Sequence, residues 1–135
     1  MRRVYADTSY WLALLNRRDQ SHRAAIQATE ELGDTEVVTS EAVLMELLNF
    51  ARLRPAFRKV AAEKVRRILD NPNIQVEPLT HRGFMEALDF YEARTDKEYS
   101  LVDCLSMTIM QSRSIQDVLT ADEHFRQEGF TLLMT

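Results

Sequence analysis

Residues 3–16, "RVYADTSYWLALLN", begin with a strand-like run, "RVYA", and continue as an apolar helix over residues 8–16. Asp7 lies at the junction between the two. A strand followed at once by a helix is the repeating unit of α/β folds. The start of the chain therefore favours an α/β fold if the same unit recurs further along.

The unit does recur up to the last residues. Further strands are predicted over residues 36–39, 74–79, 116–120 and 130–134, and further helices over 21–32, from Ser40 to 51, 55–70, 82–94, 100–112 and 122–127. Five strands separated by helices predict a central, mainly parallel sheet of four to five strands with helices on both faces. No repeat or linker marks a second domain, so residues 1–135 are predicted to form one layered domain.

Composition narrows the class of protein. Hydrophobic residues make up 45% and charged residues 28%, as in ordinary soluble globular proteins. The single cysteine, Cys104, excludes an internal disulfide and a multi-cysteine zinc site, which favours a reducing cytoplasm. No run is apolar enough to span a bilayer, so no membrane association is expected. A net charge of −4 neither indicates nor excludes nucleic-acid binding, because local patches and bound cations decide it.

Four acidic residues stand out by position. Asp7 and Asp122 each follow a predicted strand, and sites in parallel sheets form outside the carboxyl ends of the strands, so these two are expected to converge. Glu46 interrupts the otherwise apolar helical stretch "AVLMELLNFA", and Asp103 lies in the apolar "SLVDCLSMTIMQS". A buried carboxylate without a partner is costly, so it is usually neutralised, paired or bound to a metal.

Together these carboxylates predict a divalent metal site. Several carboxylates in one pocket repel one another and raise each other's pKa, and Mg²⁺ or Mn²⁺ relieves that repulsion. Metal ions held in this way activate water for attack on a phosphodiester and stabilise the leaving oxygen. We expect Asp7 and Asp103 to be direct or water-mediated ligands, and Glu46 and Asp122 to complete the cluster or orient the water.

Each acid also has a structural interpretation. Asp7 is placed to cap the helix that follows it. "SLVD" (100–103) matches a capping box, and so does "TADE" (120–123), in which Thr120 would be the cap. Glu46 has no capping role, although a buried ion pair with an arginine would account for it.

Four segments in order along nearly the whole chain resemble the successive motifs of PIN domains, in particular the VapC-type toxin ribonucleases: "VYADTSYWLALLN", "VVTSEAVLMELLNF", "DKEYSLVDCLSM" and "VLTADEHFRQEGF". The resemblance implies a compact α/β/α sandwich and RNA cleavage that depends on Mg²⁺ or Mn²⁺. It also implies a hydroxyl neighbour of the site at Thr8 or Ser100, a small antitoxin partner and a homodimer. It places the family's acidic positions, none of them replaced here, at Asp7, Glu46, Asp103 and Asp122.

A basic stretch is the other candidate for substrate contact. Residues 54–67, "RPAFRKVAAEKVRR", carry six basic side chains and one acid. Arg54 and Arg58 are candidates for contacts to RNA phosphates, and the alternative is a solvated helix face. His124, two residues after Asp122, is expected to be a surface residue that has some chance of reaching the substrate.

The sequence therefore predicts a metal-dependent endoribonuclease with water as nucleophile, the toxin of a type II toxin–antitoxin pair. Other phosphodiesterases on this layout, such as a DNA nuclease or a phosphatase, remain alternatives. A receiver-like regulatory module is disfavoured because Asp7 stands alone and no lysine follows "VLT". A PIN-like scaffold that binds RNA without cutting it is the third alternative.

Overall fold

The computed structural model describes residues 1–134 and contains one five-stranded sheet. Its strands are β1 (Arg3–Ala6), β2 (Glu36–Ser40), β3 (Ile74–Glu77), β4 (Asp117–Leu119) and β5 (Thr131–Leu132). The strand order is β3-β2-β1-β4-β5, and every neighbouring pair is parallel. The predicted parallel α/β sheet is confirmed.

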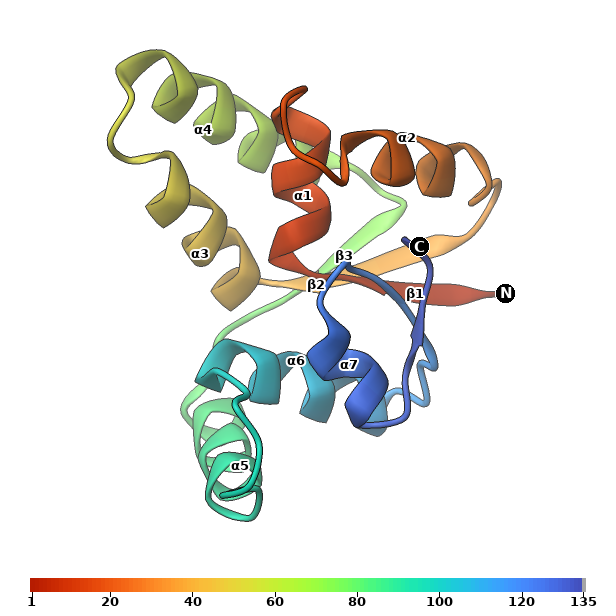
Figure 1. The fold of residues 1–135 in the computed structure, drawn as a ribbon, viewed down its shortest axis with the longest axis vertical. Coiled ribbons are helices and arrows are strands. Elements are labelled where there is room, and N and C mark those ends of the chain that lie inside the picture. The colour runs from red at the N-terminus through yellow and green to blue at the C-terminus, as the bar shows by residue number, and fades with distance from the viewer. Residues whose placement is uncertain (135) are drawn as a thin grey trace.

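Helices cover both faces of this sheet. They are α1 (Thr8–Leu15), α2 (His22–Glu30), α3 (Glu41–Ala51), α4 (Pro55–Asp70), α5 (His81–Glu92), α6 (Leu101–Ser112) and α7 (Glu123–Gln127). Figure 1 shows the sheet nearly edge-on, with α1 to α4 above it and α5, α6 and α7 below it. The predicted α/β/α sandwich is thus confirmed. Along residues 1–134, no helix combines the length and apolar character that crossing a bilayer requires.

The central strand β1 is buried on both faces, as a strand between two helical layers must be. Val4, Tyr5 and Ala6 have no exposed surface. The Tyr5 hydroxyl donates to Ser40 Oγ (3.1 Å) and hydrogen-bonds Ser106 Oγ (2.9 Å). Because Ser40 caps α3 and Ser106 lies in α6, this one hydroxyl connects the central strand to a helix of each layer.

The strand order places a topological switch at β1. The chain runs outward from β1 through β2 to β3 and then returns to the other side of β1 with β4 and β5. Ligand sites in open parallel sheets form outside the carboxyl ends of the strands at such a switch. The backbone N–H of Asp7 donates to the carbonyl of Leu119 (3.1 Å), so the residues that follow β1 and β4 lie side by side.

The predicted elements differ from the observed ones mainly at their ends. The strand predicted over 74–79 ends at Glu77, because Pro78 has no N–H and the N–H of Leu79 donates to Glu41 Oε1 (2.6 Å) instead. The strand predicted over 130–134 shortens to the two residues of β5 at the edge of the sheet. The strand predicted over 116–120 is shorter by one residue at each end, so β4 ends at Leu119 and Thr120 follows it.

Candidate metal centre

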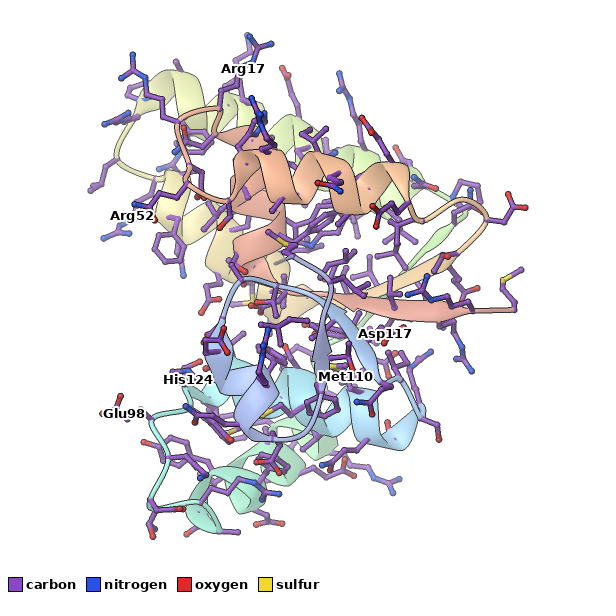
Figure 2. All side chains as sticks on the ribbon, turned by 45° about the vertical axis from the view of Figure 1, so that its right-hand side comes forward. Arg17, Arg52, Glu98, Met110, Asp117 and His124 are labelled. Carbon is purple, nitrogen blue, oxygen red and sulfur yellow. The ribbon has the colours of Figure 1, made fainter. Side chains whose placement is uncertain are left out.

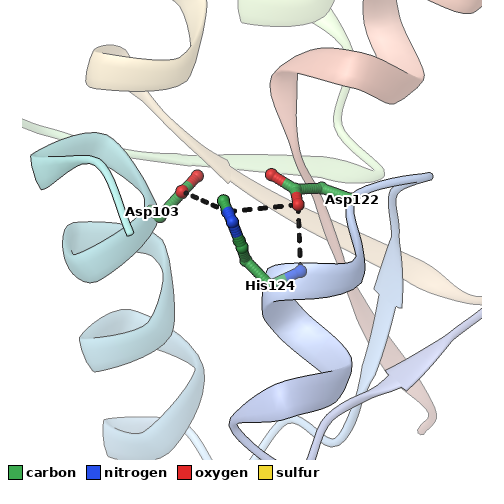
Figure 3. Close-up of side chains that lie close together, drawn as sticks. All are labelled: Asp103, Asp122 and His124. Atoms are coloured by element: carbon green, nitrogen blue, oxygen red, sulfur yellow. Dashed lines mark hydrogen bonds and ion pairs between the residues drawn. The ribbon is translucent and has the colours of Figure 1, made fainter. Parts of the chain in front are cut away.

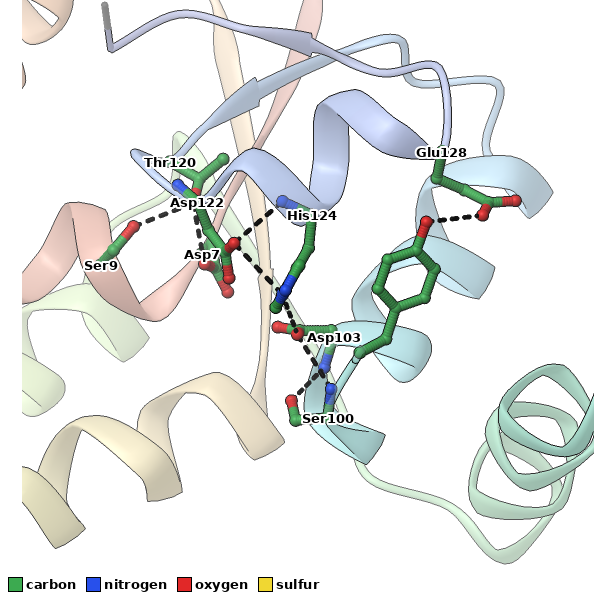
Figure 4. A network of polar contacts seen from close by, with 9 residues as sticks. Asp7, Ser9, Ser100, Asp103, Thr120, Asp122, His124 and Glu128 are labelled. Atoms are coloured by element: carbon green, nitrogen blue, oxygen red, sulfur yellow. Dashed lines mark hydrogen bonds and ion pairs between the residues drawn. The ribbon is translucent and has the colours of Figure 1, made fainter. Parts of the chain in front are cut away.

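A pocket of about 320 Å³ lies where α1 and α7 begin, beyond the carboxyl ends of β1 and β4. Four separate segments bring carboxylates to it: the caps of α1 and α7, the middle of α3 and the first turn of α6. Figure 4 shows part of this arrangement. The pocket is lined by all four acids singled out in the sequence, Asp7, Glu46, Asp103 and Asp122, and by Thr8, Ser9, Ser100 and His124 among others.

Asp7 is the most buried of the four acids, with 4% of its surface exposed. It occupies the cap position of α1, but its carboxylate makes no capping hydrogen bond, so the capping interpretation of this side chain is wrong. Its Oδ2 instead accepts a hydrogen bond from Thr120 Oγ1 (3.0 Å). Burial, with a smaller contribution from the carboxylates of Asp103 and Glu46, raises the pKa of Asp7 to about 7.

The hydroxyls of Thr120 and Ser9 fix the relative positions of Asp7 and Asp122. Thr120 Oγ1 hydrogen-bonds Ser9 Oγ (2.9 Å) and accepts the backbone N–H of Asp122 (3.1 Å). Asp122 is itself the cap of α7, where its Oδ1 accepts the N–H of His124 (2.9 Å). The predicted capping box at 120–123 is therefore wrong, because Asp122 and not Thr120 caps α7, and the Thr120 hydroxyl donates to Asp7 instead. Sequence analysis missed this role for Thr120, although its place directly after β4 was a signal.

The carboxylate of Glu46 is paired with a threonine hydroxyl and not with an arginine side chain. Thr8 Oγ1 donates to Glu46 Oε1 at 2.5 Å. Within residues 1–134, no lysine or arginine forms an ion pair with Glu46, so the arginine interpretation is wrong. Burial raises the pKa of Glu46, and the carboxylates of Asp103 and Asp122 raise it as well.

Asp103 both caps a helix and faces the pocket. Its N–H donates to Ser100 Oγ and its Oδ2 accepts the N–H of Ser100, both at 3.0 Å, so the predicted capping box is confirmed. Capping does not exclude metal binding, because a carboxylate has about four lone-pair positions. Burial raises the pKa of Asp103, and the carboxylate of Asp122 adds to this, whereas His124 opposes it.

His124 lies between two of the acids and is half-buried, so the prediction that it is a surface residue is confirmed only in part. Only 28% of its side chain is exposed. Figure 3 shows its Nδ1 between Asp103 Oδ2 (3.4 Å) and Asp122 Oδ1 (3.3 Å). The short helix α7 turns the side chain toward the pocket because His124 follows the Asp122 cap by two residues. That two-residue spacing was the signal in the sequence, but spacing alone does not reveal direction.

Comparison with known proteins places this arrangement in a family. The PIN domain family model matches residues 4–130. The chain belongs to the PIN domain family. The predicted resemblance to VapC-type PIN domains is also confirmed: the chain is 29% identical over 127 residues to the 23S rRNA-specific endonuclease VapC20 of Mycobacterium tuberculosis, with 94% of this chain and 95% of that protein covered.

Solved structures agree with this assignment. The crystal structure of Mycobacterium tuberculosis VapC20, described as a Sarcin–Ricin loop cleaving toxin, matches with a TM-score of 0.84 and 28% identity over 95% of this chain and 96% of that one. VapBC2 from Rickettsia felis bound to a promoter DNA fragment matches with a TM-score of 0.69 at 11% identity and 96% coverage of both chains. FitAcB from Neisseria gonorrhoeae matches with a TM-score of 0.66 at 15% identity over 96% and 95%. The last two comparisons support the fold of this PIN domain.

PIN nucleases depend on divalent metal ions, and the donors of this PIN domain fit such an ion. Asp103, Asp122 and His124 each offer a ligand atom, and these atoms lie within 4.8 Å of one another. Within residues 1–134, no lysine or arginine forms an ion pair with any of the four acids. Burial chiefly, and the neighbouring carboxylates to a smaller extent, raise the pKa values of Asp7, Glu46 and Asp103, and a bound cation would favour the charged form of each carboxylate.

The basic residues proposed for substrate binding lie apart from the acids of this PIN domain. Arg54 lines a separate pocket of about 410 Å³ with Arg17 and Arg18 at the end of α1, and Arg58 donates to the carbonyl of Arg52 (3.4 Å). Figure 2 shows Arg17 and Arg52 projecting from the upper layer, away from His124. Within residues 1–134, neither Arg54 nor Arg58 lines the acidic pocket, so a role in RNA binding stays a prediction for both.

Thr8 offers a direct test of how Glu46 is positioned. Thr8→Val keeps the shape of this buried residue but removes the donor to Glu46 Oε1. We expect kcat for RNA cleavage to fall about tenfold or more with little change in KM, because removal of a partner that only orients a functional side chain typically costs about 10–100-fold. Thr8→Ser restores the donor and is expected to restore most of kcat. A Thr8→Val variant with the kcat of the parent protein would contradict this role.

Proposed function

We propose that this PIN domain is a metal-dependent endoribonuclease and the toxin of a toxin–antitoxin pair. The observation that carries the proposal is the convergence of Asp7, Glu46, Asp103 and Asp122 on one pocket at the topological switch of the sheet. A structural role does not account for this, because only Asp103 and Asp122 of the four have side chains that cap a helix.

A bound divalent ion would supply Lewis acidity and an activated water. The residues of the chain would hold the ion and position the attacking water. Asp7, Asp103 and Asp122 would hold the ion, and the Ser9–Thr120 hydroxyl pair would keep Asp7 in place. Glu46, whose pKa is raised and whose Oε1 is held by Thr8, would orient the attacking water and accept its proton.

RNA is the substrate class that the comparisons support best. VapC20, which is similar to this chain over nearly its full length, is named for endonuclease action on 23S rRNA. Mg²⁺ and Mn²⁺ are the proposed ions, because the four acids offer oxygen ligands. Action in the cytoplasm would follow from such a substrate.

The proposed activity can be tested on three substrates in parallel. The purified chain would be incubated with total RNA, with single-stranded DNA and with a small phosphoester, each with Mg²⁺, with Mn²⁺ or with EDTA. We expect discrete RNA cleavage with either metal, none in EDTA and little turnover of the other two substrates. Cleavage that persists in EDTA, or equal turnover of DNA, would contradict the proposal.

An antitoxin partner is part of the proposal. An apolar pocket of about 270 Å³ lies among α3, α5 and α6, where Met45 is 55% exposed and Phe84 42% exposed. An exposed apolar groove of this kind suits the apolar face of a partner helix. Glu46 lines both this groove and the acidic pocket, so a bound antitoxin would sit beside the metal centre. Phe50 and Leu53, also exposed, are candidates for the interface of a homodimer.

A further inference from the structure

The Nδ1 atom of His124 is buried, and within residues 1–134 it has no hydrogen-bond partner. Buried polar atoms in native proteins nearly always have a partner, because an unsatisfied one loses its hydration without compensation. The carboxylates of Asp103 and Asp122 both lie within 3.5 Å of this nitrogen, at 3.4 and 3.3 Å. A partner from outside the chain, either a water molecule or a cation, is therefore needed to satisfy Nδ1.

A simple ion pair does not account for the geometry. The distances from Nδ1 to Asp103 Oδ2 and Asp122 Oδ1, 3.4 and 3.3 Å, exceed the roughly 2.7–2.9 Å of charge-assisted hydrogen bonds. Each of these oxygens accepts one backbone N–H, from Ser100 at 3.0 Å and from His124 itself at 2.9 Å, and keeps a further lone pair for a cation. The imidazole lies almost equally far from both acids and is hydrogen-bonded to neither.

Coordination of one cation by His124, Asp103 and Asp122 does account for these distances. Ligands on bonds of about 2.1 Å at right angles to one another are roughly 3.0 Å apart, close to both observed separations. We propose that Nδ1 of His124 is a nitrogen ligand of the metal ion held by Asp103 and Asp122. This inference rests on the proposed metal-dependent function, and it adds a ligand that the four acidic positions do not include.

The surroundings of His124 hold the imidazole in place for this role. Its ring packs against that of Tyr99, with centroids 5.6 Å apart. The Tyr99 hydroxyl donates to Glu128 Oε1 (3.0 Å), and Arg94 holds Glu128 through three contacts of 2.7–3.0 Å. Because Tyr99 is itself held by these hydrogen bonds, its ring limits rotation of the imidazole. Figure 4 shows Glu128 on the same side of α7 as His124.

A nitrogen ligand changes which ion the centre prefers. Mg²⁺ favours oxygen ligands, whereas imidazole increases affinity for transition-metal ions, and Mn²⁺ accepts both. The side of the pocket formed by Asp103, Asp122 and His124 is therefore expected to bind Mn²⁺ in preference to Mg²⁺. An all-carboxylate centre would discriminate less between the two ions.

The test is electron spin echo envelope modulation spectroscopy of Mn²⁺ bound to the purified chain. An imidazole that is directly bound to the ion gives a nitrogen coupling in this spectrum. We expect this coupling in the parent protein and in His81→Ala, which removes an exposed histidine that does not line the pocket, and its loss in His124→Ala. Calorimetric titration of His124→Ala is expected to show Mn²⁺ affinity reduced about tenfold or more, with Mg²⁺ affinity changed by less than about threefold.

The possible outcomes separate this inference from the proposed function. Mn²⁺ bound to the parent protein without nitrogen coupling would overturn the assignment of His124 and leave the carboxylate site intact. Failure of the parent protein to bind either ion would overturn both. The measurement on the parent protein does not depend on a variant, so misfolding of His124→Ala, detectable by circular dichroism, would not obscure the result.

Discussion

Asp7→Asn is expected to lower kcat/KM for metal-dependent RNA cleavage by about 10³-fold or more. Asp7 is proposed as a direct ligand, and loss of a direct ligand exceeds the roughly 10–100-fold loss seen for groups that only orient ligands. The asparagine keeps an oxygen that can accept from Thr120 Oγ1, so the local hydrogen bonding is retained while the charge is removed. Steady-state cleavage of an RNA substrate under saturating Mn²⁺ measures the effect.

Asp117→Asn is the matched control for this experiment. Asp117 begins β4, pairs with Arg2 at 2.9 Å and does not line the acidic pocket. We expect its loss to leave kcat/KM within about twofold, because exposed ion pairs contribute little. Retention of metal-dependent cleavage within about tenfold in Asp7→Asn would remove Asp7 from the catalytic residues.

The metal-free protein is expected to lose about 4 kcal/mol of its free energy of unfolding between about pH 4 and pH 7 through Asp7 alone. The pKa of this carboxyl rises from 3.8 to about 7 in the folded protein, and one pKa unit corresponds to about 1.4 kcal/mol. In this window the folded state holds a proton that the unfolded state has released, so stability falls as the pH rises. Above about pH 7 this loss is complete.

Other acids also change how the free energy of unfolding depends on pH, and the sign of each contribution follows from the direction of its pKa shift. The raised pKa values of Glu46 and Asp103 add to the loss. The pKa of Glu128 is lowered by its hydrogen bonds to Arg94, so its stabilisation is present at neutral pH and is lost as the pH falls. The contribution of Asp7 therefore has to be isolated by a difference measurement.

Urea unfolding in EDTA of the parent protein and of Asp7→Asn supplies that difference. The variant lacks the titrating group, so its stability is expected to decline less across the same pH range and to exceed that of the parent at about pH 8. Saturating Mn²⁺ is expected to stabilise the parent at that pH, because a ligand that binds the folded state shifts the equilibrium toward it. Parallel pH profiles for the two proteins would contradict the assigned shift.

The fold was predictable because its signals are local. The alternation of apolar strands and amphipathic helices specifies a doubly covered parallel sheet. The order of the strands was not predictable in the same way, because the return of the chain from β3 to the far side of β1 depends on packing between distant segments. That return is what brings Asp122 beside Asp7.

The residues of the candidate site could be predicted only where their place in a helix or after a strand set them apart from ordinary surface acids. Asp7 follows a strand and Glu46 interrupts an apolar helix, so both were found from the sequence. The prediction that Thr120 caps α7 was wrong, and Asp122 is the cap. The cap depends on a tertiary contact that the sequence does not reveal, the hydrogen bond from Thr120 to Asp7. The inward direction of His124 depends on the same turn.

One wall of the acidic pocket is also a wall of the apolar groove, because Glu46 belongs to both. Two ligands that share a side chain are thermodynamically coupled, and the factor by which one changes the affinity of the other is the same in both directions. A helix seated in the groove that displaces the Glu46 carboxylate would take a negative charge away from the ion and so weaken ion binding, and ion loading would in turn weaken binding of the helix. Inhibition of this kind requires no blockage of the substrate path, only the rotation of one glutamate.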